Sequence, residues 1–367
     1  MSATVPQIQF GADRRSLDPL RGFRTPGEFL YAVHRAGAGG RVDERLEPLR
    51  QAVAGSDENS GADGGSGGFL VPAGLAPTAL RRELDDDPCA GRTLRVPMSA
   101  PIVGVPARVD ANHQTSVSGG LTVTRGRLQT TAIASSREKF EGVVLEAKST
   151  FALTFATDEL VTDSIVTFAE VLAIAFRDEM AALDLDERLR GLDARQYRGI
   201  LHSPALITVD AEPGQAAGTI TGPNIEAMRG RCWGYRRAVW IATPDTQPQV
   251  MRLSLPVGVG GSELPLFHFA ESEDEMDMLA GRPIFFNERA SNLGAVGDLV
   301  LVDWTQYLDG TYQAQTGVDS IHVRFVEHEH AFKFWARTDG APWWQAPLTP
   351  KYSTTTRSPY VTLAARA

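Results

Sequence analysis

The sequence has few of the residues that mark a disulfide-rich, zinc-binding or membrane-spanning protein. Only two cysteines occur, Cys89 and Cys232, far apart and outside any CxxC or Cys/His spacing. This excludes a disulfide framework and argues against structural zinc, so both are expected to be buried small residues in a reducing compartment. The longest aliphatic run, Val171–Phe176, is far too short to cross a bilayer, and residues 1–10 lack the order of a secretory signal. We therefore expect a soluble protein with no membrane partner.

Lysine is also scarce, and the charge is unevenly distributed. The chain has four lysines, so arginine supplies nearly all of its positive charge, which favours bidentate contacts with carboxylates. Residues 1–50 hold eight arginines against six carboxylates, a net charge of +2. Because the whole chain has a net charge of −9, the remaining residues carry −11. An acidic body with a weakly basic N-terminal segment excludes a dedicated nucleic-acid reader but allows weak, sequence-independent attraction to a polyanion.

The first 68 residues are predicted to be an N-terminal arm without a core of its own. Two short helical patterns, at 26–33 and 42–53, are followed by a linker rich in Gly, Ser and Asp over Ser56–Gly68. The apolar sequence that can build a core starts at Phe69. No repeat of fixed period is present, which argues against a solenoid or propeller.

Residues 96–157 are predicted to be β-strand and loop with almost nothing to bury against. Gly119 and Gly120 interrupt the middle of this stretch, and Phe151, Leu153 and Phe155 continue a period-two apolar pattern at its end. A compact domain rarely carries so long a segment without a core, so we expect it to cover a neighbouring molecule.

The strongest helical pattern follows directly. Asp163 or Ser164 can cap it, and Gly191 is expected to end it in a left-handed conformation. About 27 residues give a rod near 40 Å long. The apolar residues predicted to share one face are Ile165, Phe168, Leu172, Phe176, Met180 and Leu183.

The C-terminal half is predicted to be mixed α/β from Tyr197 to Tyr312 and mostly β beyond Gly317. Asp339-Gly340 is predicted to be a hairpin turn. Buried strands are expected at Ala238–Ala242, Leu299–Val302 and Tyr360–Leu363. In the late β-segment, Ile321, Val323 and Phe325 should share one face, and His322, Arg324 and Val326 the other.

No motif in the chain supports catalysis, cofactor binding or metal binding, so no residue is assigned to such a site. Gly64–Gly68 matches G-x-S-x-G around Ser66 but follows a linker rather than a strand. Glu327–His330 places two histidines on one strand face without a third ligand, which favours solvated or interface histidines. Five carboxylates within residues 271–277 lack EF-hand spacing, and Gly258–Gly261 lacks the frame of a phosphate loop.

Taken in order, several segments resemble the major capsid protein of tailed bacteriophages, which has the Hong Kong 97-like fold. Each motif is weak alone, and their shared order and spacing from about residue 67 to the end make the resemblance. They are Gly67–Pro72, Val96–Met98, Asp158–Ser164, Ala238–Thr246, Leu279–Ile284, Gly297–Leu299 with Tyr307, and Ser358–Leu363.

The resemblance implies an α+β fold divided between a peripheral P-domain, an axial A-domain and an extended E-loop. It also implies a head protein that assembles as pentamers and hexamers into an icosahedral-type shell around double-stranded DNA, in the virion, after assembly in the bacterial host cytoplasm. Portal, scaffolding or decoration proteins are further expected partners. The implied segments are 1–68 arm, 69–97 start of the P-domain, 98–148 E-loop, 149–198 P-domain with the long helix, 199–316 A-domain, 317–353 P-domain β-segment and 354–367 C-terminal A-domain strand.

Two features depart from the pattern of relatives. Some relatives join an E-loop lysine to a P-domain asparagine, but the last asparagine here is Asn292, in the A-domain stretch. We therefore expect no covalent link from Lys139 or Lys148. Others remove a long N-terminal segment, whereas this arm is short and is expected to be retained. A phage head and a gene transfer agent head both remain open, with an encapsulin-like shell, a hydrolase or a sugar-binding β-protein as alternatives.

Overall fold

The computed structural model describes Arg35 and residues 86–108, 110–123, 125, 135–163, 168–257, 262–271 and 275–366. The chain divides into two compact units. Unit 1 comprises Arg35 and the described residues of 151–176 and 317–334, and unit 2 comprises those of 86–150, 177–316 and 335–366. Apart from Arg35, the predicted N-terminal arm and its linker lie outside the described residues.

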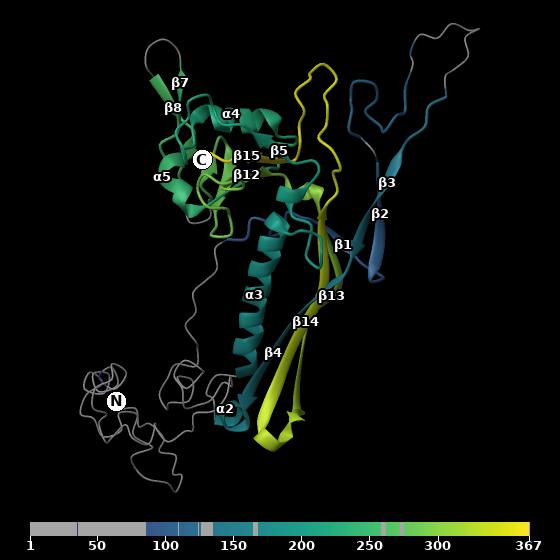
Figure 1. Ribbon diagram of the computed structural model, residues 1–367, viewed down its shortest axis with the longest axis vertical. Helices are drawn as coiled ribbons and strands as arrows, with labels where there is room; N and C mark the ends of the chain where they lie inside the picture. Colours follow the sequence, from purple (N-terminus) through teal and green to yellow (C-terminus); the bar gives the residue numbers. More distant parts are fainter. Residues whose placement is uncertain are drawn as a thin grey trace, which may run out of the picture. The chain divides into compact units, whose positions relative to one another are not determined.

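Unit 2 contains a seven-stranded mixed sheet (Figure 1). The pairs β5–β15 and β6–β11 are parallel, and the other neighbouring strands are antiparallel. The predicted buried strands near 239, 299 and 360 are confirmed as β6, β12 and β15. The strand order is β5 (Ile207–Val209), β15 (Tyr360–Leu363), β12 (Leu299–Val302), β6 (Val239–Ala242), β11 (Arg282–Phe286), β10 (Met278–Leu279) and β9 (Phe267–His268).

Both faces of this sheet are buried, which explains its uninterrupted apolar strands. In β6, Trp240 and Ala242 pack into one core, whereas Val239 and Ile241 pack into the other. The first core includes residues of α4 (Gly222–Arg231) and α5 (Gln247–Val250). The second includes Leu185 and Leu189 from the end of α3 (Phe168–Arg190), together with Cys89. Strands of only four residues are stable here, because the side chains on both faces of the sheet are buried from solvent.

Both cysteines are buried, as predicted, and neither forms a disulfide. Burial raises the pKa of the Cys89 thiol well above its ordinary value and raises that of Cys232 to about 12. Such thiols are protonated at neutral pH and therefore unreactive.

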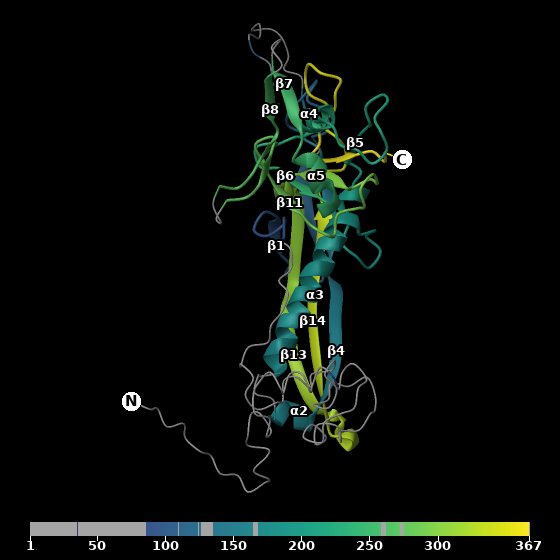
Figure 2. The ribbon, with the colours of Figure 1, turned by 90° about the vertical axis from the view of Figure 1, so that its left-hand side faces the viewer.

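A short hairpin of β7 (Ser254–Val257) and β8 (Ser262–Pro265) lies beside α4 in both views (Figures 1 and 2). A Cβ atom on Gly222, the first residue of α4, would lie 3.3 Å from the Ser254 carbonyl oxygen. The predicted loop at Gly258–Gly261 connects these two strands and lies outside the described residues. No helix in the described ranges is long and apolar enough to cross a membrane.

A second sheet has the strand order β1 (Leu94–Pro97), β13 (Tyr307–Arg324), β14 (Glu329–Pro342) and β4 (Lys148–Thr157). The late β-segment thus begins at Tyr307, ten residues before the predicted Gly317. Its first strand, β13, ends at Arg324, because Phe325–Glu327 forms a 3₁₀ turn and His328 adopts a left-handed φ of 54° before β14 begins. Phe325 and Val326 therefore do not continue the two strand faces, and that part of the prediction is wrong.

The predicted hairpin turn at Asp339-Gly340 is also wrong, because both residues lie inside β14. Gly340 is needed there for close packing, since a Cβ atom on it would lie 2.6 Å from the Tyr307 hydroxyl. Asp339 accepts hydrogen bonds from the backbone of Glu146 at 2.7 Å and from Lys148 Nζ at 2.6 Å. A turn signal in the local sequence is thus overridden by long-range contacts.

The predicted long helix is confirmed as α3, whose 23 residues make a rod of about 35 Å. It follows a short helix, α2 (Asp158–Asp163). Of its predicted N-terminal residues, Asp163 ends α2, and Ser164 and Ile165 lie outside the described residues. Leu183 is exposed, contrary to prediction. The buried residues Ala182, Leu185 and Leu189 recur at three- and four-residue spacing, which places the buried face one residue before Leu183.

Gly191 ends α3 as predicted, but not in a left-handed conformation. Its amide donates to the Glu187 carbonyl at 2.8 Å, and its carbonyl accepts from Gly199 at 2.9 Å. A Cβ atom at Gly191 would overlap the Tyr197 carbonyl oxygen. The glycine is required here because the chain folds back onto the end of the helix, not because of its φ angle.

Unit 1 is held together by contacts between the ends of its strands and helices. The rings of Phe176 and Phe334 stack with 5.2 Å between their centroids. Arg324 covers the ring of Phe155 at 4.0 Å, and the backbone N–H of Asp158, the first residue of α2, donates to the His328 carbonyl at 3.0 Å. These contacts join β4 and α2 to the β13–β14 turn.

A buried charge cluster lies at the C-terminal end of α3 in unit 2. Arg188 Nη2 is 3.0 Å from Asp309 Oδ2 and 3.9 Å from Asp184 Oδ2. Burial raises the pKa of the Asp184 carboxyl to about 6, and the nearby Arg188 only partly opposes this shift. The fold therefore favours the protonated form of Asp184.

This shift predicts a pH-dependent stability. A carboxyl whose pKa is higher in the folded state stabilises the fold fully below about pH 4 and loses that contribution as pH rises to about 6. For a shift of this size the loss is about 3 kcal/mol. In Asp184→Asn the side chain is neutral throughout, so the difference in unfolding free energy between variant and wild type should grow by about that amount from pH 4 to pH 7. Denaturant unfolding at four pH values measures it, and parallel pH profiles would contradict it.

Candidate assembly surfaces

The segment predicted to be the E-loop contains a two-stranded antiparallel hairpin with two different faces. Strand β2 (Ile102–Arg108) pairs with β3 (Phe140–Glu146) in antiparallel register, from Ile102 opposite Glu146 to Arg108 opposite Phe140. Residues directly opposite each other share a face, and successive residues alternate between faces. The burial of these strands alternates in the same way.

One face is packed within unit 2. Val143 and Leu145 are buried and form a small core with Met98, Leu308 and Ala341. Leu145 is completely inaccessible to solvent. The prediction that residues 96–157 have almost nothing to bury against is therefore wrong for the base of the loop. There β3 packs against Leu308 of β13 and Ala341 of β14.

The other face of the hairpin is apolar and open to solvent. Ile102, Phe140 and Val144 are 60%, 63% and 62% exposed. Gly104 pairs with Val144 and Gly142 pairs with Pro106 on this face, so the glycines leave the neighbouring apolar side chains uncovered. We call Ile102, Phe140 and Val144 the open face. Large exposed apolar side chains grouped on one surface indicate an interaction site.

Beyond the hairpin the chain continues into an exposed turn. The Ser116 hydroxyl accepts hydrogen bonds from the amides of Ser118 and Gly120, and Gly120 has a φ of 112°. The predicted interruption at Gly119 and Gly120 is thus confirmed. Exposed apolar side chains also occur here, at Val117, Leu121 and Val123.

Unit 1 also has exposed apolar side chains, on β4 and β13, which together we call the unit 1 surface. Phe151 and Leu153 of β4 are exposed, whereas Phe155 lies half-buried under Arg324. The predicted period-two pattern is present, but its first two members face solvent. Strand β13 contributes further exposed residues, Val318, Ile321 and Val323.

The two lysines considered for a covalent link lie in different surroundings. Lys148 Nζ is 2.6 Å from Asp339 Oδ1 and 3.5 Å from Asp193 Oδ1, so it is held in ion pairs within its own chain. Burial raises the pKa of Asp339, and its hydrogen bond with Lys148 opposes the shift. Lys139 is exposed next to the open face.

The two histidines weighed as metal ligands both lie near the Asp158 carboxylate, and Glu329 is paired elsewhere. Glu329 is buried against Arg324 at 2.8 Å. His330 Nε2 lies 3.0 Å from Asp158 Oδ1, and His328 Nδ1 lies 3.9 Å from Asp158 Oδ2. Among the described residues no group of three or more His, Cys, Asp or Glu side chains could hold a metal ion.

The acidic stretch is a loop closed by its own hydrogen bonds. Asp277 accepts from the amide of Ala270 at 3.0 Å, and Glu275 accepts from that of Glu271 at 3.2 Å. Residues 272–274 and the G-x-S-x-G match at Gly64–Gly68 lie outside the described residues. The open face and the unit 1 surface are therefore the features that function has to explain.

Comparison with known proteins identifies the family. The model of the phage capsid family matches residues 67–350 of the 367 in the chain. No curated protein matches the sequence.

Solved structures show the same fold at low sequence identity. The capsid of a native GTA particle is 16% identical with a TM-score of 0.57, over 82% of this chain and 97% of that one. Structures from Microbacterium phage Oxtober96, at 14% identity and a TM-score of 0.56 over 82% of this chain and 98% of that one, and from Mycobacterium phage Bobi, at 14% and 0.53 over 82% and 97%, are similar too. These likenesses establish the Hong Kong 97-like fold, as the sequence predicted. The chain therefore belongs to the phage capsid family, as a major capsid protein, a structural subunit that assembles with its own copies into a virion shell.

Proposed function

We propose that the shell is closed by overlap of neighbouring subunits, with the open face of each hairpin packed on the next copy. The observation that carries this proposal is the exposure of Ile102, Phe140 and Val144 on a hairpin whose opposite face packs Val143 and Leu145 into a core. A two-stranded hairpin with one bare apolar face gains stability when a partner covers that face. Phe151, Leu153 and the exposed residues of β13 offer a matching apolar surface on the neighbour.

Each of the predicted domains has a role in this proposal. The E-loop, 98–148, carries the open face, and the P-domain segments, 149–198 and 317–353, include the apolar surface of unit 1. The A-domain, 199–316 with 354–367, contains all seven strands of the mixed sheet and would surround the axes of pentamers and hexamers. An obligate assembly of this kind buries several thousand Å² per subunit.

The particle is further proposed to enclose double-stranded DNA, from either a tailed phage or a gene transfer agent. The net charge of −9 favours weak, non-specific contact over tight DNA binding, because tight binding needs clustered basic residues. Portal, scaffolding or decoration proteins would complete the particle during assembly in the bacterial host cytoplasm. The subunit is expected to have no enzymatic activity.

Electron microscopy and nuclease protection test these points together. Negative-stain images of the purified protein should show closed shells, and sedimentation should give a megadalton species. Particles from the native source, treated with nuclease and then opened, should release double-stranded DNA. A single repeated genome would identify a phage head, and heterogeneous host fragments a gene transfer agent head. Shells that protect only protein cargo would favour the encapsulin-like alternative.

The shell is predicted to be held by non-covalent contacts alone. Lys148 is already paired with Asp339, and no asparagine follows Asn292 in the late β-segment. Boiling mature particles in detergent should therefore return single chains on a denaturing gel. A ladder of covalent multimers would contradict this, and peptide mass spectrometry would then show whether Lys139 is the donor.

A further inference from the structure

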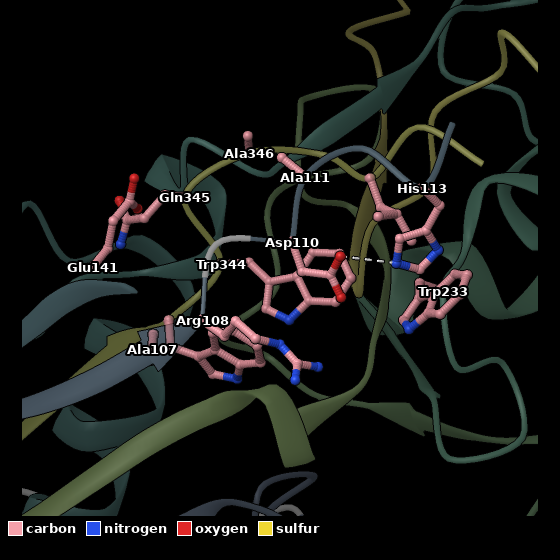
Figure 3. Close-up of a pocket in the computed structure, with 12 residues that line it drawn as sticks. Ala107, Arg108, Asp110, Ala111, His113, Glu141, Trp233, Trp344, Gln345 and Ala346 are labelled. Carbon is pink, nitrogen blue, oxygen red and sulfur yellow. Dashed lines mark ion pairs between the residues drawn. The ribbon is translucent and has the colours of Figure 1, made fainter. Parts of the chain in front are cut away.

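Three of the six tryptophans of the chain line one pocket of unit 2 (Figure 3). Trp343 and Trp344 follow β14, and Trp233 follows α4. The ring centroids of Trp343 and Trp344 are 5.8 Å apart, and those of Trp233 and Trp344 are 6.4 Å apart. The pocket has a volume of about 250 Å³, which suits one long side chain rather than a drug-sized molecule.

Backbone hydrogen bonds hold the walls of this pocket in place. The amide of His113 donates to the Thr349 carbonyl, and the amide of Thr349 donates to the Ala111 carbonyl, both at 2.9 Å. The indole N–H of Trp344 donates to Gln306 Oε1 at 3.0 Å. The base of the E-loop is thus joined directly to the segment that carries two of the tryptophans, so the pocket exists before any ligand arrives.

The charged residues of the pocket include more carboxylates than guanidinium groups. Asp110 and Glu141 contribute two carboxylates against one guanidinium, that of Arg108, so the lining is net negative when His113 is neutral. Asp110 Oδ1 lies 3.1 Å from His113 Nε2, whose ring in turn meets Trp233 edge-on. An arginine side chain satisfies this combination, because its flat cation stacks on indole faces and donates paired hydrogen bonds to carboxylates.

We infer that the pocket binds an arginine side chain from residues 13–25 of this chain. That segment contains Arg14, Arg15, Arg21 and Arg24 and no lysine. It belongs to the part of the sequence with a charge of +2, whereas the remainder carries −11, so the two are complementary. The sixty residues between Thr25 and Asp86 can extend up to about 200 Å, enough to reach this pocket on the same or a neighbouring copy. Docking there would fasten the N-terminal arm to the base of the E-loop, which goes beyond shell formation itself.

Photocrosslinking from the arm tests this inference, because the probe reacts with whichever surface of the protein lies beside it. Benzoylphenylalanine is placed at Phe23, between Arg21 and Arg24, in the full-length protein. After irradiation, mass spectrometry should find crosslinks to peptides that contain residues 107–113, Trp233 or 343–348. Mixing ¹⁴N- and ¹⁵N-labelled subunits reports which copy provides the pocket. Crosslinks concentrated on any other surface, or none in protein of verified labelling, would overturn the inference.

Matched variants separate recognition from a general effect on folding. Glu141→Gln removes one pocket carboxylate from an exposed position, and Arg21→Gln with Arg24→Gln removes the two arginines on either side of Phe23. Each should lower the crosslink yield about tenfold, as expected when a paired cation is lost. The control, Glu138→Gln, changes an exposed carboxylate of the same loop outside the pocket and should have no effect. Equal yields in Glu141→Gln and Glu138→Gln would refute the assigned site. The crosslink yield is measured on both dissociated and assembled protein. A failure of shell assembly is thereby distinguished from a failure of the arm to bind the pocket.

Discussion

Replacing Ile102, Phe140 and Val144 by threonine is expected to abolish closed shells while leaving the subunit folded. The three side chains are exposed on the open face, and threonine keeps the preference for β-structure, so the fold should lose less than about 1 kcal/mol. At a subunit interface the same three side chains would contribute about 1.5–3 kcal/mol each on burial. Because the deficit recurs at every contact in the shell, assembly should fall below detection.

Electron microscopy and sedimentation measure the assembly defect, and denaturant unfolding measures the fold. Leu145→Ala is the matched control on the opposite face of the same hairpin. It should destabilise the subunit by about 2–5 kcal/mol, because it leaves a cavity among buried side chains. Normal shells from the threonine variant would show that the open face is not an assembly contact. Loss of folding in that variant would instead place the three residues in the core of the monomer.

The elements predicted best from the sequence are those whose burial is complete on both sides. Strands β6 and β12 appear as uninterrupted apolar runs, because the two cores of the seven-stranded sheet each take alternate side chains. Helix α3 is buried on one face in its C-terminal part, where Ala182, Leu185 and Leu189 recur at helical spacing. In each case the apolar pattern is visible in the local sequence because it results from the burial of those same side chains.

The predictions that failed depend on contacts between residues far apart in the sequence. Asp339 and Lys148 are separated by 191 positions, and their ion pair keeps β14 extended through a sequence that favours a turn. The open face was missed for a related reason. Ile102 and Phe140 are apolar, and only the register of β2 against β3 shows that they face solvent whereas Val143 and Leu145 do not. The tryptophan pocket likewise joins three segments that no local pattern connects.

Gly191→Ala, which adds a single methyl group, is expected to destabilise the subunit strongly. An alanine Cβ at this position would overlap the Tyr197 carbonyl oxygen and lie 2.7 Å from that of Glu187. Both are backbone atoms, so no side-chain rotation relieves the overlap. Relief requires separating the end of α3 from the returning chain at Gly199, whose amide donates to the Gly191 carbonyl. The cost should exceed the roughly 1–3 kcal/mol of ordinary overpacking.

Gly230→Ala is the control, because a Cβ atom at Gly230 meets nothing within 4 Å and the residue lies within α4. Alanine is favoured over glycine in a helix, so this variant should be unchanged or more stable by about 0.5–1 kcal/mol. Denaturant unfolding of the two variants beside wild type measures the contrast, with recovery of soluble protein as a second readout. Because the end of α3 packs in the second core of the sheet, its displacement should also expose Leu189 and prevent shell formation. If Gly191→Ala were as stable as Gly230→Ala, the close backbone approach would not be what requires glycine at the end of this helix.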